Sequence, residues 1–182
     1  MMADSVLDDG DGALFALASR VIAENRAAGR CIALAESCTG GMVATALTDV
    51  PGSSDVFGAG FVTYSNDAKQ AMLGVSADIF TMFGAVSMAC TWAMATGAIA
   101  RGDADIAVAI SGVAGPGGGS DAKPVGTVVL SRVLRGQSAD DAYSTVKHFD
   151  ASAGRAGIRR QATLLALELL LPEKDGLRGC SV

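Results

Sequence analysis

The sequence predicts an α/β protein, a three-layer α/β/α sandwich built around a mixed sheet. Short buried apolar runs alternate with segments of helical periodicity, and two later segments alternate apolar and polar residues as antiparallel strands do. The chain of 182 residues is long enough for one well-buried core. We expect one domain at 13–171 between mobile ends at 1–12 and 172–182, which show no sustained periodicity.

The first part of the chain alternates helices and strands. Apolar residues recur at helical spacing from Ala13 to Ala28, and Gly29 then provides a stop. The expected helices of this part are 13–28, 42–48, 66–73 and 87–100, and the expected strands are 31–35, 60–64 and 105–110. Asn66 is the expected N-cap of its helix, because asparagine is favoured at that position.

The second part begins with a segment that is too glycine-rich to continue a strand or a helix, residues 112–120. Ordering so many glycines costs chain entropy, and a purely structural loop seldom needs them. Residues 125–133 and 143–149 then alternate like antiparallel strands, and 156–171 returns to helical spacing.

Charge and composition exclude several classes of function. The net charge is −5, the pI is about 4.7, and no cluster of Lys or Arg could neutralise a run of phosphates, so we expect no direct nucleic-acid binding. No apolar run reaches the roughly 18 residues of a membrane span, and the N-terminus is acidic, so we expect a cytoplasmic protein with no membrane association. Four cysteines without a CxxC pair and one histidine, His148, predict no metal site.

Residues 36–41, Glu-Ser-Cys-Thr-Gly-Gly, lie where a buried strand meets a helix. A hydroxyl on such a turn can project from the sheet while neighbouring amides stabilise an oxyanion, so Ser37 is a candidate nucleophile. An equally weighted alternative is that Ser37 or Thr39 only caps the helix. Cys38 is a second candidate, because a helix N-terminus can lower the pKa of a thiol.

A serine nucleophile needs a base, and Lys69 fits that role better than His148. Lysine acts as a base only when burial or positive potential lowers its pKa. Lys69 falls in the first turn of its expected helix, where the helix dipole disfavours an ammonium, and apolar residues follow it. Tyr64, at the end of a strand, could hold or relay the proton, although packing is the more common role of such a tyrosine.

The glycine-rich segment could cradle a phosphate or an oxyanion with its backbone amides. It is neither a P-loop nor a dinucleotide-binding motif, so we expect no cofactor. Arg155, Arg159 and Arg160 open or precede the last helix. At least two of them are expected on a solvated face, and one could clamp a substrate phosphate.

Four separated blocks then resemble one family, the C-terminal domain of the competence/damage-inducible protein CinA. The blocks are AESCTGG at 35–41, VTYSNDAK at 62–69, GAVS at 84–87 and SGVAGPGGGS at 111–120, with KPVGT following at 123–127. They occur in the same order and cover roughly residues 14–171. Two departures are Ala153-Gly154-Arg155, where the family has Gly-Asp-Arg, and Asp121-Ala122, where it has an acidic pair.

The resemblance implies a stand-alone nicotinamide-nucleotide amidase, which hydrolyses nicotinamide mononucleotide to nicotinate mononucleotide and ammonia in pyridine-nucleotide recycling, without metal or cofactor. It places the nucleophile on Ser37 and the assisting groups on Tyr64 and Lys69. The substrate-binding positions that it implies are Thr39, Asn66, Gly112, Ala114, Gly115 and Arg155. Whether Arg155 or Arg159 holds the phosphate stays open, as does the oligomeric state, a homo-oligomer included. The alternative is a non-catalytic nucleotide- or protein-binding module linked to competence and DNA-damage responses.

Overall fold

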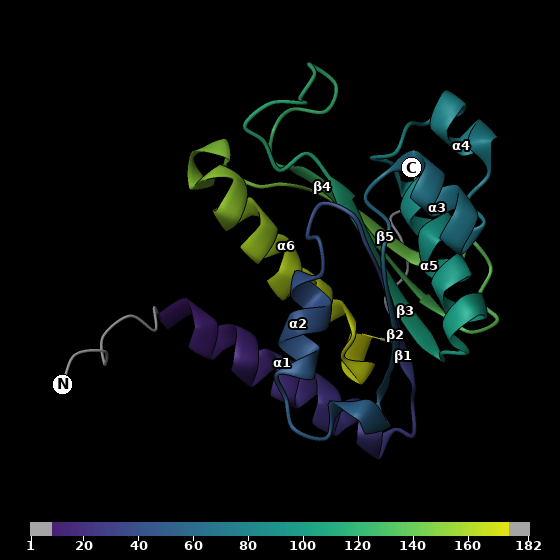
Figure 1. The fold of residues 1–182 in the computed structure, drawn as a ribbon, viewed down its shortest axis with the longest axis vertical. Helices are drawn as coiled ribbons and strands as arrows, with labels where there is room; N and C mark the ends of the chain where they lie inside the picture. The colour runs from purple at the N-terminus through teal and green to yellow at the C-terminus, as the bar shows by residue number, and fades with distance from the viewer. Residues whose placement is uncertain (1–8, 175–182) are drawn as a thin grey trace.

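A computed structural model describes residues 9–174 and confirms the predicted three-layer α/β/α architecture (Figure 1). The central sheet has the strand order β2-β1-β3-β4-β5. Its strands are β1 (Ile32–Glu36), β2 (Phe57–Val62), β3 (Ile106–Gly112), β4 (Thr127–Leu134) and β5 (Tyr143–His148). The strands β2, β1 and β3 are parallel, whereas β4 and β5 are antiparallel to their neighbours, so the sheet is mixed as predicted.

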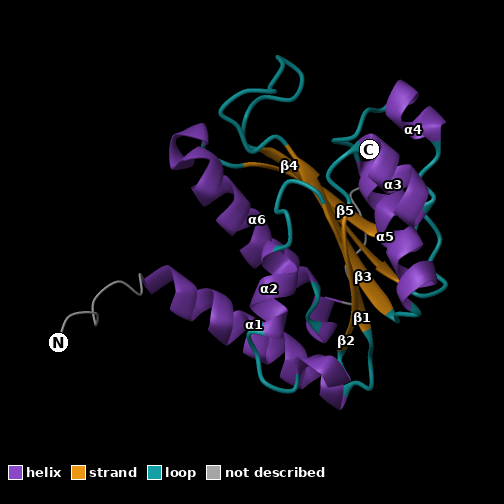
Figure 2. Cartoon of the chain, in the orientation of Figure 1, coloured by secondary structure: helices purple, strands orange, loops and turns teal. Residues whose placement is uncertain are grey.

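Helices cover both faces of the sheet (Figure 2). One face carries α1 (Asp9–Ala27), α2 (Met42–Thr48) and α6 (Gly154–Leu169). The other face carries α3 (Asn66–Leu73), α4 (Ala77–Met82) and α5 (Met88–Gly102). None of the described helices is both long and apolar enough to cross a lipid bilayer.

The two faces of the sheet bury side chains of different size. Ile32 and Leu34 of β1 pack with α1, α2 and α6, whereas the alternate residues Ala33 and Ala35 pack against α5. The strand β3 repeats this pattern. Because side chains alternate across a strand, one run of apolar residues gives one face of large side chains and one face of alanines. The alanine face lets α5 lie close to the sheet, which fixes the position of its N-terminal turn.

The strand order brings the carboxyl ends of β2, β1 and β3 to the same edge of the sheet. The chain leaves β1 through α2 on one face to reach β2, and it returns through α3, α4 and α5 on the other face to β3. The connections that leave the neighbouring strands β1 and β2 therefore depart to opposite faces, and in open α/β sheets ligands bind at the carboxyl ends of such strands.

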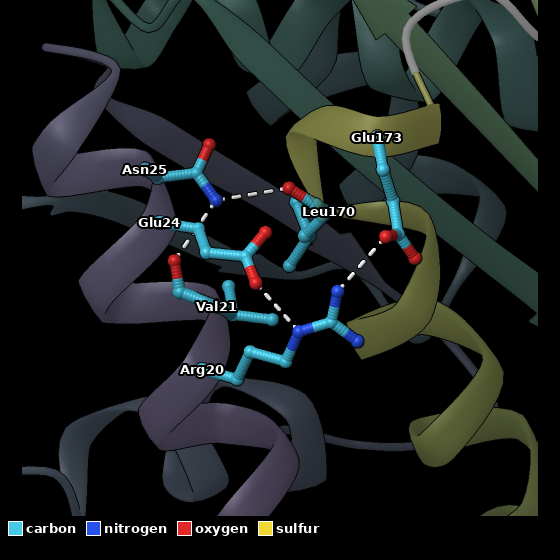
Figure 3. Close-up of polar contacts among 6 residues, drawn as sticks. All are labelled: Arg20, Val21, Glu24, Asn25, Leu170 and Glu173. Carbon is cyan, nitrogen blue, oxygen red and sulfur yellow. Dashed lines mark hydrogen bonds and ion pairs between the residues drawn. The ribbon is translucent and has the colours of Figure 1, made fainter.

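Hydrogen bonds and ion pairs connect α1 to the last described residues of the chain (Figure 3). The buried Asn25 donates from Nδ2 to the carbonyl oxygens of Val21 and Leu170, both at 2.9 Å. Arg20 pairs with Glu24 and, at 2.9 Å, with Glu173. This joint holds α1 against the end of α6.

The described elements extend beyond the expected domain at 13–171. Helix α1 begins at Asp9, so residues 9–12 are part of it. Residues 172–174 form a 3₁₀ turn that includes Glu173. Residues 1–8 and 175–182, the remainder of the two predicted ends, lie outside the described residues.

Other predicted elements differ in smaller ways. The strand expected at 60–64 is β2 at Phe57–Val62, and helix α4 was not predicted. Asn66 is not an N-cap. The cap of α3 is Ser65, whose Oγ accepts a hydrogen bond from the Ala68 amide at 3.0 Å, while Asn66 is the first helical residue. The serine side chain therefore satisfies the amide of the third helical residue, as an N-cap does.

Candidate functional site

Ser37 directly follows β1, at the carboxyl end of the β1–β3 pair. Its amide donates to the carbonyl oxygen of Ile110 in β3 at 3.0 Å, which extends the pairing of the two strands by one residue. The turn then passes through Gly40 and Gly41, both with positive φ, of 60° and 97°. Glycine adopts this backbone conformation without steric cost, so the chain can reverse immediately after the serine.

The buried carboxylate of Glu36 caps helix α2. Its Oε2 accepts from the Gly41 amide at 2.9 Å and from Val43 at 3.3 Å, and its Oε1 accepts from Ala44 at 2.9 Å. A carboxylate at a helix N-terminus accepts hydrogen bonds from unpaired amides and interacts favourably with the positive end of the helix dipole. The prediction that Ser37 or Thr39 caps this helix is therefore wrong, and the Ser37 hydroxyl is not committed to capping.

Sequence reasoning gave Glu36 no role. A usable signal existed, because an acidic residue ends an otherwise apolar strand directly before a turn with two glycines and a helix. A charged residue in a strand buried at every position is expected to have a specific partner.

Lys69 reaches from α3 to Ser37. Its Nζ lies 3.1 Å from the Ser37 Oγ and donates to the carbonyl oxygen of Thr63 at 2.8 Å. Lys69 is only 1% exposed and Ser37 only 8% exposed. Within the described part of the chain, no carboxylate forms an ion pair with Lys69. Burial lowers the pKa of this amine from its ordinary value, because no acidic partner offsets the loss of hydration.

The pKa direction agrees with the expectation, but the main cause is different. The sequence suggested the dipole of α3, whereas desolvation is the largest cause in the structure. Lys69 is the fourth residue of α3 and one of its two buried residues. The helix is held there by close contact with α5, since a Cβ added to Gly97 would lie 2.1 Å from the carbonyl oxygen of Leu73.

Cys38 is a poor alternative nucleophile. The thiol is 5% exposed, and burial raises its pKa to about 11. The expected lowering by the helix N-terminus does not occur, because Glu36 already occupies the first amides of α2. A protonated, buried thiol behaves as a small apolar side chain.

His148 is remote from Ser37. It lies on the edge strand β5, and β3 and β4 separate that strand from β1. Its Nδ1 lies 3.2 Å from the Thr127 Oγ1, and it is not part of a cluster with acids or cysteines. Residues 9–174 contain no group of three or more His, Cys, Asp or Glu side chains that could hold a metal ion.

Tyr64 and Arg155 form a bridge at the surface of the protein. Arg155, in the first turn of α6, donates to the Tyr64 hydroxyl at 2.6 Å and to the carbonyl oxygen of Gly115 at 2.9 Å. The bridge therefore joins the β2–α3 connection to the glycine-rich loop. Tyr64 is 59% exposed, and its hydroxyl accepts a hydrogen bond from Arg155 rather than bonding to Ser37 or Lys69. A phenol that accepts one hydrogen bond can still donate its own proton.

Arg159 lies deeper than Arg155 and has a different role. Its Nε and Nη2 donate to the carbonyl oxygens of Cys38, at 3.1 Å, and Thr39, at 2.6 Å. The guanidinium thereby supports the turn that carries Ser37. Thr39 is fully buried, and its hydroxyl has no hydrogen-bond partner among the described residues.

The remaining predicted substrate-binding residues lie at the same edge of the sheet or beside it. Gly112 ends β3, and an added Cβ would lie 2.8 Å from the carbonyl oxygen of Thr127, so a side chain does not fit there. Ala114 and Gly115 are buried at the start of the glycine-rich loop, and Asn66 is exposed at the start of α3. In Figure 1 the loop and the N-terminal end of α6 stand together at the top of the sheet.

Comparison with known proteins identifies relatives of this arrangement. A family model of the CinA C-terminal domain matches residues 14–173. A CinA-like protein of Mycolicibacterium gilvum is 50% identical over 143 residues, which are 79% of this chain and 33% of the relative. A putative competence-damage inducible protein of Symbiobacterium thermophilum is 46% identical over 154 residues, 83% of this chain and 35% of the relative. The chain thus spans about a third of the length of these relatives.

Solved structures match over almost their full length. The competence/damage inducible protein CihA from Agrobacterium tumefaciens has a TM-score of 0.83 at 44% identity, covering 92% of this chain and 97% of that chain. A CinA superfamily protein from Escherichia coli has a TM-score of 0.76 at 37% identity, covering 93% and 92% respectively.

Proposed function

Because this chain belongs to the CinA C-terminal domain family, we propose that it is an amidohydrolase that converts nicotinamide mononucleotide to nicotinate mononucleotide and ammonia, a step of pyridine-nucleotide recycling. The observation that carries the proposal is the buried pair of Ser37 and Lys69, 3.1 Å apart. A hydroxyl beside a desolvated amine is an arrangement for nucleophilic catalysis, since the amine can act as a base once it is neutral.

The first step of the proposed reaction is proton transfer within this pair. A neutral Lys69 keeps one N–H on the carbonyl oxygen of Thr63 and uses its lone pair to accept the Ser37 proton. The Ser37 Oγ then attacks the carboxamide carbon of the substrate. The carbonyl oxygen becomes an oxyanion, which needs preorganised donors.

Two sets of backbone amides can supply these donors. The amides of Gly41, Val43 and Ala44 are excluded because Glu36 holds them. The amides of Cys38 and Thr39 donate to no oxygen among the described residues, and those of the glycine-rich loop stand at the same edge of the sheet. Lys69 returns its proton to the leaving ammonia, and water then hydrolyses the acyl-enzyme with Lys69 again as base.

Arg155 is the better candidate than Arg159 for the substrate phosphate. Arg159 is occupied by the carbonyls of two buried residues, whereas Arg155 is exposed and bonds Tyr64 and Gly115 at the surface. A phosphate can replace these neutral acceptors with charge-assisted bonds. Tyr64 would then be released to assist proton transfer.

Ammonia release on incubation with nicotinamide mononucleotide tests the proposal. An amidase produces nicotinate mononucleotide and ammonia in equal amounts. The alternative, a non-catalytic binding module linked to competence or DNA damage, gives saturable binding and no product. Absence of both products from folded protein would reject the amidase.

Ser37→Ala tests the nucleophile. We expect turnover to fall by at least about 10³-fold while substrate affinity stays within about tenfold, because the nucleophile acts chiefly in the transition state. Cys38→Ala is the matched control, since it removes the neighbouring protonated thiol. Activity that survives Ser37→Ala but is lost in Cys38→Ala would transfer the role to the thiol.

A further inference from the structure

A second cavity, of about 440 Å³, lies between the α4–α5 connection, β4 and β5. Phe83 and Met88 form one wall, and Val129 and Val146 form the opposite wall. None of Ser37, Lys69, Tyr64 or Arg155 lines it. Cavities of this size commonly hold a small organic molecule, and apolar walls with a few polar groups are typical of such sites.

The walls of this cavity are unusually apolar for surface positions. Phe83 is 50% exposed, Val146 41% and Met88 38%. Met82, next to Phe83, is 71% exposed. Exposed apolar side chains scattered singly need no explanation, but several around one hollow mark a binding site.

The two titratable side chains that line the cavity are both basic, Lys123 and His148, and none of the described lining residues is acidic. This contrasts with the net charge of −5 of the whole chain. Lys123 donates from Nζ to the carbonyl oxygen of Phe83 at 2.8 Å, so the ammonium is anchored at the cavity with two further N–H donors to spare. His148 is oriented through Nδ1 by Thr127, which leaves its Nε2 for a ligand.

From this arrangement we propose that the cavity is a second binding site, separate from Ser37 and Lys69, for a small organic anion with an aromatic or branched apolar body. The apolar walls hold the body, and Lys123 with His148 holds the acidic group. The site is independent of the proposed amidase activity, and its test needs no turnover.

The test compares two probes with nearly the same body on the full chain. The first is 1-anilinonaphthalene-8-sulfonate, an aromatic anion, and the second is N-phenyl-1-naphthylamine, which lacks the sulfonate. Fluorescence titration should give one bound sulfonate probe per chain, with affinity about tenfold or more above that of the neutral probe, because a charge-assisted bond is added. Equal affinities for the two probes would overturn the anion specificity.

Variants assign the binding to this cavity. Lys123→Gln keeps a donor for the Phe83 carbonyl but removes the charge, so it should lose most of the preference for the sulfonate. Val146→Asp places a negative charge in an apolar wall and should weaken sulfonate binding by about tenfold or more. Phe15→Asp, at a position 50% exposed on α1, is the control for added charge and should change affinity less than about twofold. Equal losses in the two aspartate variants would refute the site.

His148 is the only histidine of the chain, so its imidazole proton resonances report on the cavity without labelling. In the unaltered protein they should shift in step with sulfonate binding. Because this measurement needs no variant, it tests the site even if a variant folds poorly. An unshifted His148 at saturation would place the probe elsewhere. Displacement of the probe by nicotinamide mononucleotide would make the cavity part of the substrate site and overturn a second site.

Discussion

Two cationic side chains at opposite ends of the sheet have opposite surroundings. Beside the amino end of β3, Arg135 is 48% exposed and pairs with Asp103 at 2.9 Å and Asp105 at 3.4 Å. Its hydrogen bond to Asp103 raises the pKa of the guanidinium. At the carboxyl end, Lys69 is 1% exposed, and burial lowers the pKa of its amine. Among the described residues, the hydrogen-bond partners of this amine are the Ser37 hydroxyl and a backbone carbonyl.

The difference separates a structural charge from a reactive one. Water and two carboxylates stabilise Arg135 in its charged form, so the guanidinium has no tendency to exchange a proton. Lys69 has lost its hydration without gaining a counter-charge, so burial lowers its pKa and it gives up its proton more readily than an exposed lysine. Perturbed pKa values of this kind concentrate at functional sites, because a general base needs a pKa near the working pH.

Of the substitutions that test this comparison, Lys69→Arg should have the largest effect, which is on turnover. An arginine keeps the positive charge and cannot lose its proton at accessible pH, so we expect turnover to fall by about 10²–10⁴-fold, the usual contribution of a general base. Circular dichroism checks the fold, and Lys69→Met serves as a second variant without a base where the larger side chain disrupts packing. Exposed Lys147→Arg is the control.

The pH profile of the unaltered enzyme tests the same assignment. Turnover should rise with pH until Lys69 is neutral, and the inflection should lie below the ordinary value of 10.5, because burial lowers this pKa. A rate that falls with pH, or an active Lys69→Arg enzyme, would exclude the Ser-Lys mechanism.

The sequence predicted the Lys69 half of this comparison and said nothing of Arg135. Helical and alternating periodicity located the elements, and the position of Ser37 between a buried strand and a helix indicated a turn that can hold chemistry. The distance between Ser37 and Lys69 depends on long-range packing, since 32 residues separate them. Asn66 and Ser65 are both good caps, and local preference could not decide between them. Short helix α4 has too few residues for a clear period.

Gly97→Ala should alter the packing that buries Lys69. The new methyl group would lie 2.1 Å from the carbonyl oxygen of Leu73, so α3 and α5 must separate. We expect the free energy of unfolding to fall by about 1–3 kcal/mol, as in other overpacked sites. We also expect turnover to fall, because α3 carries Lys69. Denaturant titration measures the first effect.

Gly12→Ala is the matched control for this change. Gly12 is also helical, but no atom lies within 4 Å of an added Cβ. The same substitution should therefore stabilise the protein, by roughly 0.5–1 kcal/mol, because alanine favours a helix more than glycine does. Equal effects at the two positions would show that α3 and α5 have no close contact at Gly97.

Lys69→Met should make the protein inactive yet more stable. Removing a desolvated amine relieves a strained site, and we expect an increase of roughly 0.5–2 kcal/mol in the free energy of unfolding at neutral pH. The pKa of Lys69 is lower in the folded than in the unfolded chain, so the unfolded chain binds more protons between the two values. The unaltered protein therefore gains stability as pH rises towards 10.5, and the advantage of the variant should shrink over that interval.

Arg135→Gln should have the smallest effect, although it removes two ion pairs. Both are exposed to solvent, so the attraction is screened and offset by the entropy of holding the side chains, and we expect almost no change in the free energy of unfolding. Exposed Arg101→Gln, beside the same loop, controls for the loss of one positive charge. The small difference between the two variants should vanish in 1 M salt, where charges are screened within about 3 Å. A clear loss of stability relative to Arg101→Gln that persists in salt would mean that Arg135 is structurally essential, and exposure would then not distinguish it from Lys69.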